Sequence, residues 1–223
     1  MSKSEKLWLS IDKKINNKPF LLGPYSSQAY LDDPKSLLFV LSRYKFCSKL
    51  LKGKQKVLEI GCGDAFGTAL LTQEVNNIFC TDINKKLLLA NKKRLKKIYP
   101  SINFEYHNFC ENEYQEKQFD AVFAIDVLEH IYKFEEKKFF KNIFKSCLES
   151  SLFIFGTPNK TAEKYSSKYS KMGHVNSKNV NQLDQTMKKY FKNVQIFGMN
   201  DEVLHTGFDN MRHYLFAICS GIK

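Results

Sequence analysis

The chain of 223 residues is 43% hydrophobic and 26% charged, which suits one folded domain with a sizeable core and excludes a disordered chain. It has no apolar run near the roughly 20 residues that cross a bilayer and no signal-peptide core, so we expect a cytoplasmic protein without membrane insertion. The formal net charge of +12 favours a solvated lysine-rich surface and leaves open a polyanionic partner.

Residues 1–33 are predicted to be an irregular extension whose aromatic side chains pack over a cleft, because prolines and glycines punctuate them. A helix is expected from Pro34 to Leu51, before Gly53. Further strands are predicted at about 56–60, 77–82, 102–107, 119–125 and 151–156, and helices at about 66–74, 84–98 and 135–147. Because strands and helices alternate, we predict an α/β fold with a parallel sheet and right-handed crossovers.

The alternation ends near Pro158. Residues 157–180 are too long and too polar for an ordinary connection, and we interpret them as a substrate loop or lid. A helix at about 179–191 and strands at about 193–199 and 212–220 should then complete the sheet. Because the chain shows neither an internal repeat nor a linker, we predict one domain over 1–223.

The most informative pattern lies in residues 57–67, where an apolar strand that contains Glu59 is followed by Gly61, Gly63 and a third glycine. Glycine lets the backbone turn sharply and lets a ligand approach closely. The next predicted strand ends at Asp82, about 20 residues beyond the turn, where a carboxylate can bind the two hydroxyls of a ribose. The spacing predicts an adenosine-type cofactor at the carboxyl edge of the sheet.

Two details favour S-adenosylmethionine over a dinucleotide. The third glycine comes one residue later than the dinucleotide pattern requires, and the carboxylate of Glu59 would repel a pyrophosphate but suits an ammonium and a sulfonium. The segments that carry a family resemblance are E-I-G-C-G-D-x-x-G, Asp82, Y-H-N-F at 106–109, F-D-x-V-x-x-x-D-V-L-E-H at 119–130 and G-T-P-N at 156–159. In them the chain resembles class I S-adenosylmethionine-dependent methyltransferases.

This resemblance implies a Rossmann-like fold with a seven-stranded, mostly parallel sheet flanked by helices. It also implies that the methionine part, the ribose and the adenine of the cofactor are bound in turn along the carboxyl edge of the sheet. The expected cofactor contacts are Arg43, Glu59, Gly61, Gly63, Asp82, Ile83, Asn108, Phe109 and Asp126. Of these, Arg43 would pair with the cofactor carboxylate, and Asn108 stands where the family often has aspartate.

A second group of polar residues follows the fourth predicted strand. Asp126, Glu129 and His130 stand at i, i+3 and i+4, which puts their side chains on one face of a helical turn, and His174 could close over them. Two carboxylates and two imidazoles can hold a divalent metal such as Mg²⁺, Mn²⁺, Fe²⁺ or Zn²⁺. The set resembles the ligands of metal-assisted O-methyltransferases of the ubiquinone pathway and of small-RNA 3′ ends, with Asp126 in place of a glutamate.

A metal-free interpretation also stands. Asp126 would then border the methionine part of the cofactor, and Glu129 and His130 would help to structure the pocket. His130 or His174 would take the hydroxyl proton during methyl transfer, because an imidazole with a pKa near neutrality can act as a general base. We therefore expect Asp126, His130 and His174 to be the catalytic residues.

We expect O-methylation of a small, anionic acceptor, although an N target stays open. The patterns L-L-G-P-Y, G-H-V-N and N-D-E-V-x-H-T-G-F resemble methyltransferases encoded among surface-polysaccharide genes, which implies sugar, nucleotide-linked or phosphoramidate substrates. Glu202, His205 and Arg212 are further candidates for substrate contacts.

Two other function classes remain open. A metal-assisted RNA 2′-O-methyltransferase is favoured by the lysine-rich segment 85–97, but the chain has no appended RNA-binding module, so nucleic acid is not the expected partner. A non-catalytic cofactor-binding scaffold is the other alternative, and the sequence leaves the oligomeric state open.

Overall fold

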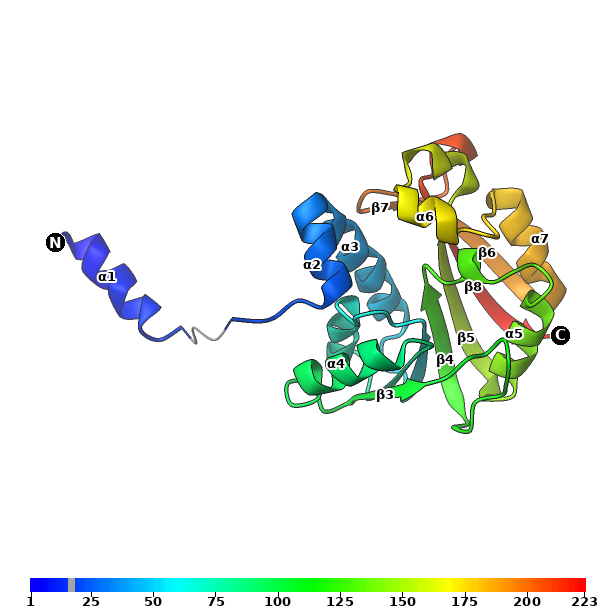
Figure 1. The fold of residues 1–223 in the computed structure, drawn as a ribbon, viewed down its shortest axis with the longest axis horizontal. Helices are drawn as coiled ribbons and strands as arrows, with labels where there is room; N and C mark the ends of the chain where they lie inside the picture. The colour runs from blue at the N-terminus through cyan, green and yellow to red at the C-terminus, as the bar shows by residue number, and fades with distance from the viewer. Residues whose placement is uncertain (16–18) are drawn as a thin grey trace.

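The computed structural model describes residues 1–15 and 19–223, and these form one eight-stranded sheet in the order β3-β2-β1-β4-β5-β8-β6-β7 (Figure 1). Five neighbouring strands are parallel: β3 (Ile102–Tyr106), β2 (Asn77–Asp82), β1 (Lys56–Ile60), β4 (Phe119–Ile125) and β5 (Cys147–Pro158). Three strands pair antiparallel: β8 (Tyr214–Ile222), β6 (Phe191–Asn200) and β7 (Val203–His205). The prediction of an α/β fold is confirmed.

The predicted seven-stranded, mostly parallel sheet needs correction, because the sheet is mixed and has an eighth strand. The three residues of β7 pair with the end of β6 through a turn at Asp201, whose φ is +49°. The segment from Asn200 to His205 is polar and lacks the apolar alternation of a strand. A hairpin can still form there, since it depends on backbone hydrogen bonds and turn geometry.

Helices cover both faces of the sheet (Figure 1). On one face lie α3 (Lys35–Leu50), the 3₁₀ helix η1 (Gly67–Gln73) and α4 (Lys85–Leu95). On the other face lie α5 (Glu136–Phe144) and α7 (Val180–Tyr190). The buried side chains form two clusters, one with Tyr44, Leu51 and Leu88 and one with Phe140 and Leu183. The core therefore holds the sheet between two helical layers.

The helix expected at 66–74 is the 3₁₀ helix η1. Gly67 packs its bare Cα against the ring of Tyr44, where a Cβ would lie 2.3 Å from ring carbon atoms. The hydroxyl of Thr68 donates a hydrogen bond of 2.8 Å to the buried Glu59. These two contacts hold the first turn close to β1, and the short segment takes the tighter helical form.

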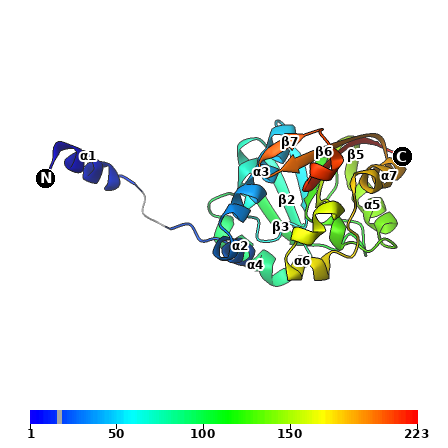
Figure 2. The same cartoon turned by 90° about the horizontal axis from the view of Figure 1, so that it is seen from above.

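The N-terminal extension is helical where the sequence analysis expected irregular structure. Helix α1 (Lys3–Asp12) begins with a capping box of Ser2 and Glu5, and α2 (Pro24–Asp32) has proline at its first position, where proline favours a helix start. No residue of α1 is buried, and α1 lies apart from the sheet in both views (Figure 2). The expectation that Trp8 packs over the cleft is therefore wrong, since 68% of its surface is exposed.

The predicted lid at 157–180 contains two short helices, η3 (Lys160–Tyr165) and α6 (Lys168–Gly173), which lie above the carboxyl end of the sheet (Figure 1). Among the described residues, no helix is long and apolar enough to cross a membrane. The division of the chain into one domain with a lid and an N-terminal cover stays a prediction.

Candidate active site

The glycine loop follows β1 and has the left-handed backbone that glycine favours. Gly61 has φ +69° and Gly63 has φ +54°. A Cβ on Gly61 would lie 2.4 Å from a methyl carbon of Val127, so a larger residue does not fit there. The N–H of Gly63 donates a hydrogen bond of 2.9 Å to the Asp82 carboxylate. The tip of β2 therefore holds the turn at the tip of β1.

A cavity of about 240 Å³ opens beside this loop. Its wall contains six of the predicted cofactor residues: Gly61, Asp82, Ile83, Asn108, Phe109 and Asp126. Asp82 accepts a second backbone hydrogen bond, from Asn84 at 2.8 Å, and Asn108 accepts one from Cys110 at 3.0 Å. Carboxylate and amide oxygens each accept more than one bond, which leaves capacity for a ligand.

Glu59 differs from its predicted role. Its side chain is 1% exposed and accepts hydrogen bonds from Tyr44 at 2.7 Å, Thr68 at 2.8 Å and Cys80 at 3.2 Å. Burial raises the pKa of Glu59 to about 7, although these three donors lower it. The carboxylate therefore lies beneath the glycine loop and supports it, away from both cavity walls.

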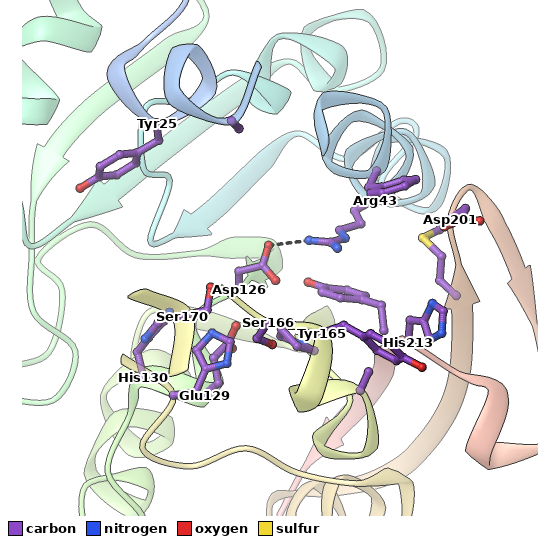
Figure 3. Close-up of a pocket in the computed structure, with 17 residues that line it drawn as sticks. Tyr25, Arg43, Asp126, Glu129, His130, Tyr165, Ser166, Ser170, Asp201 and His213 are labelled. Carbon is purple, nitrogen blue, oxygen red and sulfur yellow. Dashed lines mark hydrogen bonds and ion pairs between the residues drawn. The ribbon is translucent and has the colours of Figure 1, made fainter. Parts of the chain in front are cut away.

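A second cavity of about 940 Å³ lies between α3, the lid and the carboxyl end of the sheet (Figure 3). Arg43, Asp126, Glu129, His130 and His174 all line it. Asp126 and His130 also line the smaller cavity, so the two spaces meet at these residues. A ligand in one cavity can thus present an atom to a ligand in the other.

Arg43 binds Asp126 directly. Its Nη1 donates a bond of 2.9 Å to the carboxylate, and its guanidinium lies 3.9 Å from the ring centre of Tyr214 (Figure 3). Burial alone would lower the pKa of Arg43, but the charge of Asp126 raises it overall. Asp126 has φ +57°, a strained conformation for a non-glycine residue, of a kind that clusters at functional sites.

Glu129, His130 and His174 form a compact cluster in which one ligand atom from each lies within 4.8 Å of the others. His130 Nδ1 lies 2.8 Å from the carbonyl oxygen of Gly173. A carbonyl only accepts, so Nδ1 carries the proton and Nε2 keeps its lone pair. The predicted fourth member, Asp126, lies outside this cluster, because its short side chain is held by Arg43.

The electrostatics of the cluster suit proton transfer. Burial, with the charge of Asp126, raises the pKa of Glu129 to about 8. One Glu129 oxygen accepts a bond of 3.0 Å from Thr157, and the other is buried without a partner among the described residues. Burial and the neighbouring His130 lower the pKa of His174, which keeps this imidazole neutral near pH 7.

The structure also corrects the substrate contacts expected near the C-terminus. Arg212 is buried and donates to the carbonyl of Gly207 at 2.7 Å, while His205 accepts from the N–H of that residue at 3.0 Å. The larger cavity is lined instead by neighbouring residues that the sequence analysis passed over, namely Met199, Asp201, His213 and Tyr214. Tyr214 belongs to an apolar strand, so the sequence pattern gave no sign of a role at the site. Strand pairing brings its side chain there.

Comparison with known proteins agrees with this geometry. Residues 57–149 match the family model described as a methyltransferase domain. A probable S-adenosylmethionine-dependent methyltransferase of Mycolicibacterium smegmatis is 24% identical over 104 residues, which cover 47% of this chain and 38% of that protein. A ubiquinone biosynthesis O-methyltransferase of Rickettsia bellii is 28% identical over 115 residues, covering 49% and 45%.

Solved structures share the fold. The methyltransferase domain of bacterial CtHen1-C has a TM-score of 0.67 at 19% identity and covers 82% of this chain and 99% of that one. The DhpI-SAH complex has a TM-score of 0.64 at 12% identity and covers 88% and 89%.

The chain spans less than half the length of these two curated relatives. Residues 57–149 thus form a methyltransferase domain within a Rossmann-like fold, and its cofactor is S-adenosylmethionine.

Proposed function

We propose that this chain transfers the methyl group of S-adenosylmethionine to a hydroxyl oxygen of a small acceptor in the larger cavity. The observation that carries the proposal is the shared wall of the two cavities at Asp126 and His130. A cofactor in the smaller cavity would present its methyl carbon at that wall. Methyl transfer is an in-line displacement, and an acceptor on the opposite side has the required direction of approach.

The histidines at the junction can supply a base. His174 lies beside His130 with ring centres 5.2 Å apart, and its lowered pKa makes the neutral imidazole available near pH 7. His130 presents the lone pair of Nε2, since Nδ1 donates to Gly173. Either ring can accept the hydroxyl proton as the new carbon–oxygen bond forms and the sulfonium loses its methyl group.

The same cluster fits a divalent metal as a further proposal. Glu129 Oε1 is buried without a partner among the described residues. In His130 the backbone contact is made by Nδ1, which leaves Nε2 available to a metal. Glu129, His130 and His174 would hold the ion, with Asp126 no longer proposed as a ligand. A bound ion would supply Lewis acidity that orients an acceptor oxygen and lowers its pKa.

The walls of the larger cavity favour a neutral, hydroxyl-bearing acceptor. Among the described residues, they carry the carboxyl groups of Asp126, Glu129 and Asp201 and one guanidinium, that of Arg43, and no lysine. The raised pKa of Glu129, about 8, keeps this one of the three carboxyl groups largely protonated near pH 7. The positive net charge of the chain therefore lies elsewhere, and an anionic phosphoramidate fits this wall less well than a sugar. We propose an uncharged sugar of surface-polysaccharide synthesis, a source supported by sequence patterns alone, since the phosphates of a nucleotide-linked sugar fit this wall less well.

The experiment is a screen of sugar and nucleotide-sugar acceptors with cofactor that carries a labelled methyl group. We expect labelled product from one acceptor class, and a loss of roughly 10²–10⁴ in kcat for His130→Ala or His174→Ala with unchanged cofactor affinity. Full activity in both variants would reject the proposed base. Activity that is lost in EDTA and restored by Mg²⁺ or Mn²⁺ would support the metal, and full activity in EDTA would reject it.

RNA 2′-O-methylation is the second candidate, favoured by the similarity of fold to the small RNA methyltransferase HEN1 and by the Glu129, His130 and His174 cluster. It predicts labelled RNA in the same assay and RNA affinity that falls steeply with salt. Labelled sugar without labelled RNA would reject it. A non-catalytic scaffold predicts cofactor binding without labelled product from any acceptor.

A further inference from the structure

The last part of the predicted lid, residues 174–178, lies against the active site and is attached there by backbone hydrogen bonds. The N–H of Asn176 donates a hydrogen bond of 3.0 Å to the carbonyl of Glu129. The carbonyl of Gly173 accepts a hydrogen bond of 2.8 Å from His130 Nδ1. His174 therefore lies between two anchors on the turn that carries Glu129 and His130. The helices of the lid itself are more exposed, with 71% of Tyr165 and 73% of Met172 open to solvent.

Side chains strengthen this attachment. Asn176 Nδ2 donates to the carbonyl of Ile131 and to the carboxylate of Glu136, both at 2.8 Å. Lys178 Nζ lies 2.5 Å from the same Glu136 oxygen, and the two side chains are only 6% and 8% exposed. Lys178 also donates to the carbonyl of Asn176 at 3.3 Å. Asn176, Glu136 and Lys178 thus form one network of buried and half-buried side chains between α5 and residues 174–178.

A buried ion pair is weak evidence for overall stability, because desolvation of both charges offsets their attraction. Such a pair is better suited to selecting one arrangement of two segments, since any other arrangement leaves a buried charge unpaired. Here the two segments are those that carry Glu129 and His174. The network of Asn176, Glu136 and Lys178 therefore lies where it can determine the geometry of the Glu129, His130 and His174 cluster.

We propose that Asn176, Glu136 and Lys178 form a clasp that positions His174 against Glu129 and His130. They are positioning residues, and none of the three lines either cavity. The clasp deepens the proposed function. Only the expected effect of the clasp on turnover rests on that proposed function. Its effect on the surroundings of His174 is independent of any reaction.

The test compares Asn176→Ala with the double variant Glu136→Gln, Lys178→Met, which removes both buried charges and avoids an unpaired one. Lys168→Met is the matched control, because it removes a lysine from the exposed side of α6 in the same lid. For each protein, we measure the contact between the His130 and His174 rings by NMR, cofactor affinity by calorimetry with S-adenosylmethionine, and kcat and KM with the identified acceptor.

We expect both clasp variants to weaken or abolish the nuclear Overhauser contact between the His174 and His130 rings, whose centres lie 5.2 Å apart in this structure. Cofactor affinity should stay within twofold and kcat should fall at least about tenfold, more than KM rises. Lys168→Met should resemble the wild type. An unchanged ring contact in Asn176→Ala would overturn the clasp, even if the double variant does not fold. If the ring contact is lost but the wild type methylates no acceptor, the clasp stands and the proposed function fails.

Discussion

At the scale of single residues, Asp82 links the backbone of the glycine loop to the cofactor cavity. Its two oxygens accept the N–H groups of Gly63 and Asn84. Asp120 is a useful counterpart, because it accepts two backbone N–H groups, those of Gln55 and Lys56, at the other end of the sheet. The two aspartates thus have equal local roles, and only Asp82 lies on a cavity wall.

We predict that Asp82→Ala weakens S-adenosylmethionine binding at least about a hundredfold, because two charge-assisted hydrogen bonds to ribose, each worth roughly 1.5–3 kcal/mol, would be lost. Titration calorimetry measures this change. Asp120→Ala is the control and should lower stability while leaving cofactor affinity unchanged. Equal affinity in Asp82→Ala and the wild type would refute the assigned ribose contact.

The raised pKa of Glu59 predicts a pH dependence of stability. Its pKa is about 7 in the folded protein and 4.5 when unperturbed, so the folded state binds more protons between these values. The free energy of unfolding should therefore fall as pH rises from about 4.5 to about 7, by roughly 3 kcal/mol, and this contribution should be constant above that range. Glu59→Gln should flatten this slope in urea unfolding series. Parallel slopes for variant and wild type would show that Glu59 titrates normally.

At the scale of elements, helix α4 separates two kinds of lysine. Lys92 and Lys93 are exposed, whereas Lys96 Nζ donates to Asn103 at 3.0 Å and to the carbonyls of Pro100 and Ile102 at 2.8 Å. The expectation that Lys96 belongs to a solvated face is therefore wrong. Its ammonium joins the end of α4 to the start of β3.

We predict that Lys92→Glu with Lys93→Glu leaves stability, cofactor affinity and turnover of a small acceptor nearly unchanged, because exposed charges interact weakly. Lys96→Glu should lower the free energy of unfolding by about 1–3 kcal/mol, since it leaves three acceptors without their donor. Urea denaturation and acceptor kinetics measure both. A rise in KM of the double variant that vanishes at high salt would instead assign the surface to a polyanion.

Helix α2 is attached to the glycine loop, and α1 is not attached to the sheet. The carboxylate of Asp64 accepts the N–H of Ser26 at 2.7 Å and its hydroxyl at 3.0 Å, and Tyr25 lines the larger cavity. Deletion of 1–15 should therefore change the free energy of unfolding by less than about 0.5 kcal/mol. Deletion of 1–33 should weaken cofactor binding several-fold. Thermal unfolding measures stability and calorimetry measures cofactor affinity for both deletions. Equal effects of the two deletions would contradict the difference between α1 and α2.

At the scale of the whole molecule, local sequence patterns determined much of the protein. The glycine spacing around Gly61 and Gly63, the strand that ends at Asp82 and the alternation of strands and helices each depend on a few neighbouring residues. Backbone sterics and side-chain period act over the same short range, so these features could be predicted from the sequence alone. Six of the predicted cofactor residues consequently lie together on the wall of one cavity.

Only the tertiary structure decided which distant groups meet. It buried Glu59 under the loop, paired Arg43 with Asp126, and separated Asp126 from the cluster that His174 completes. It also brought Tyr214 from an apolar strand to the active site. Such contacts follow from the packing of the whole sheet and its helices, where one neighbour's shape and charge determine another's position, and no local spacing in the chain encodes them.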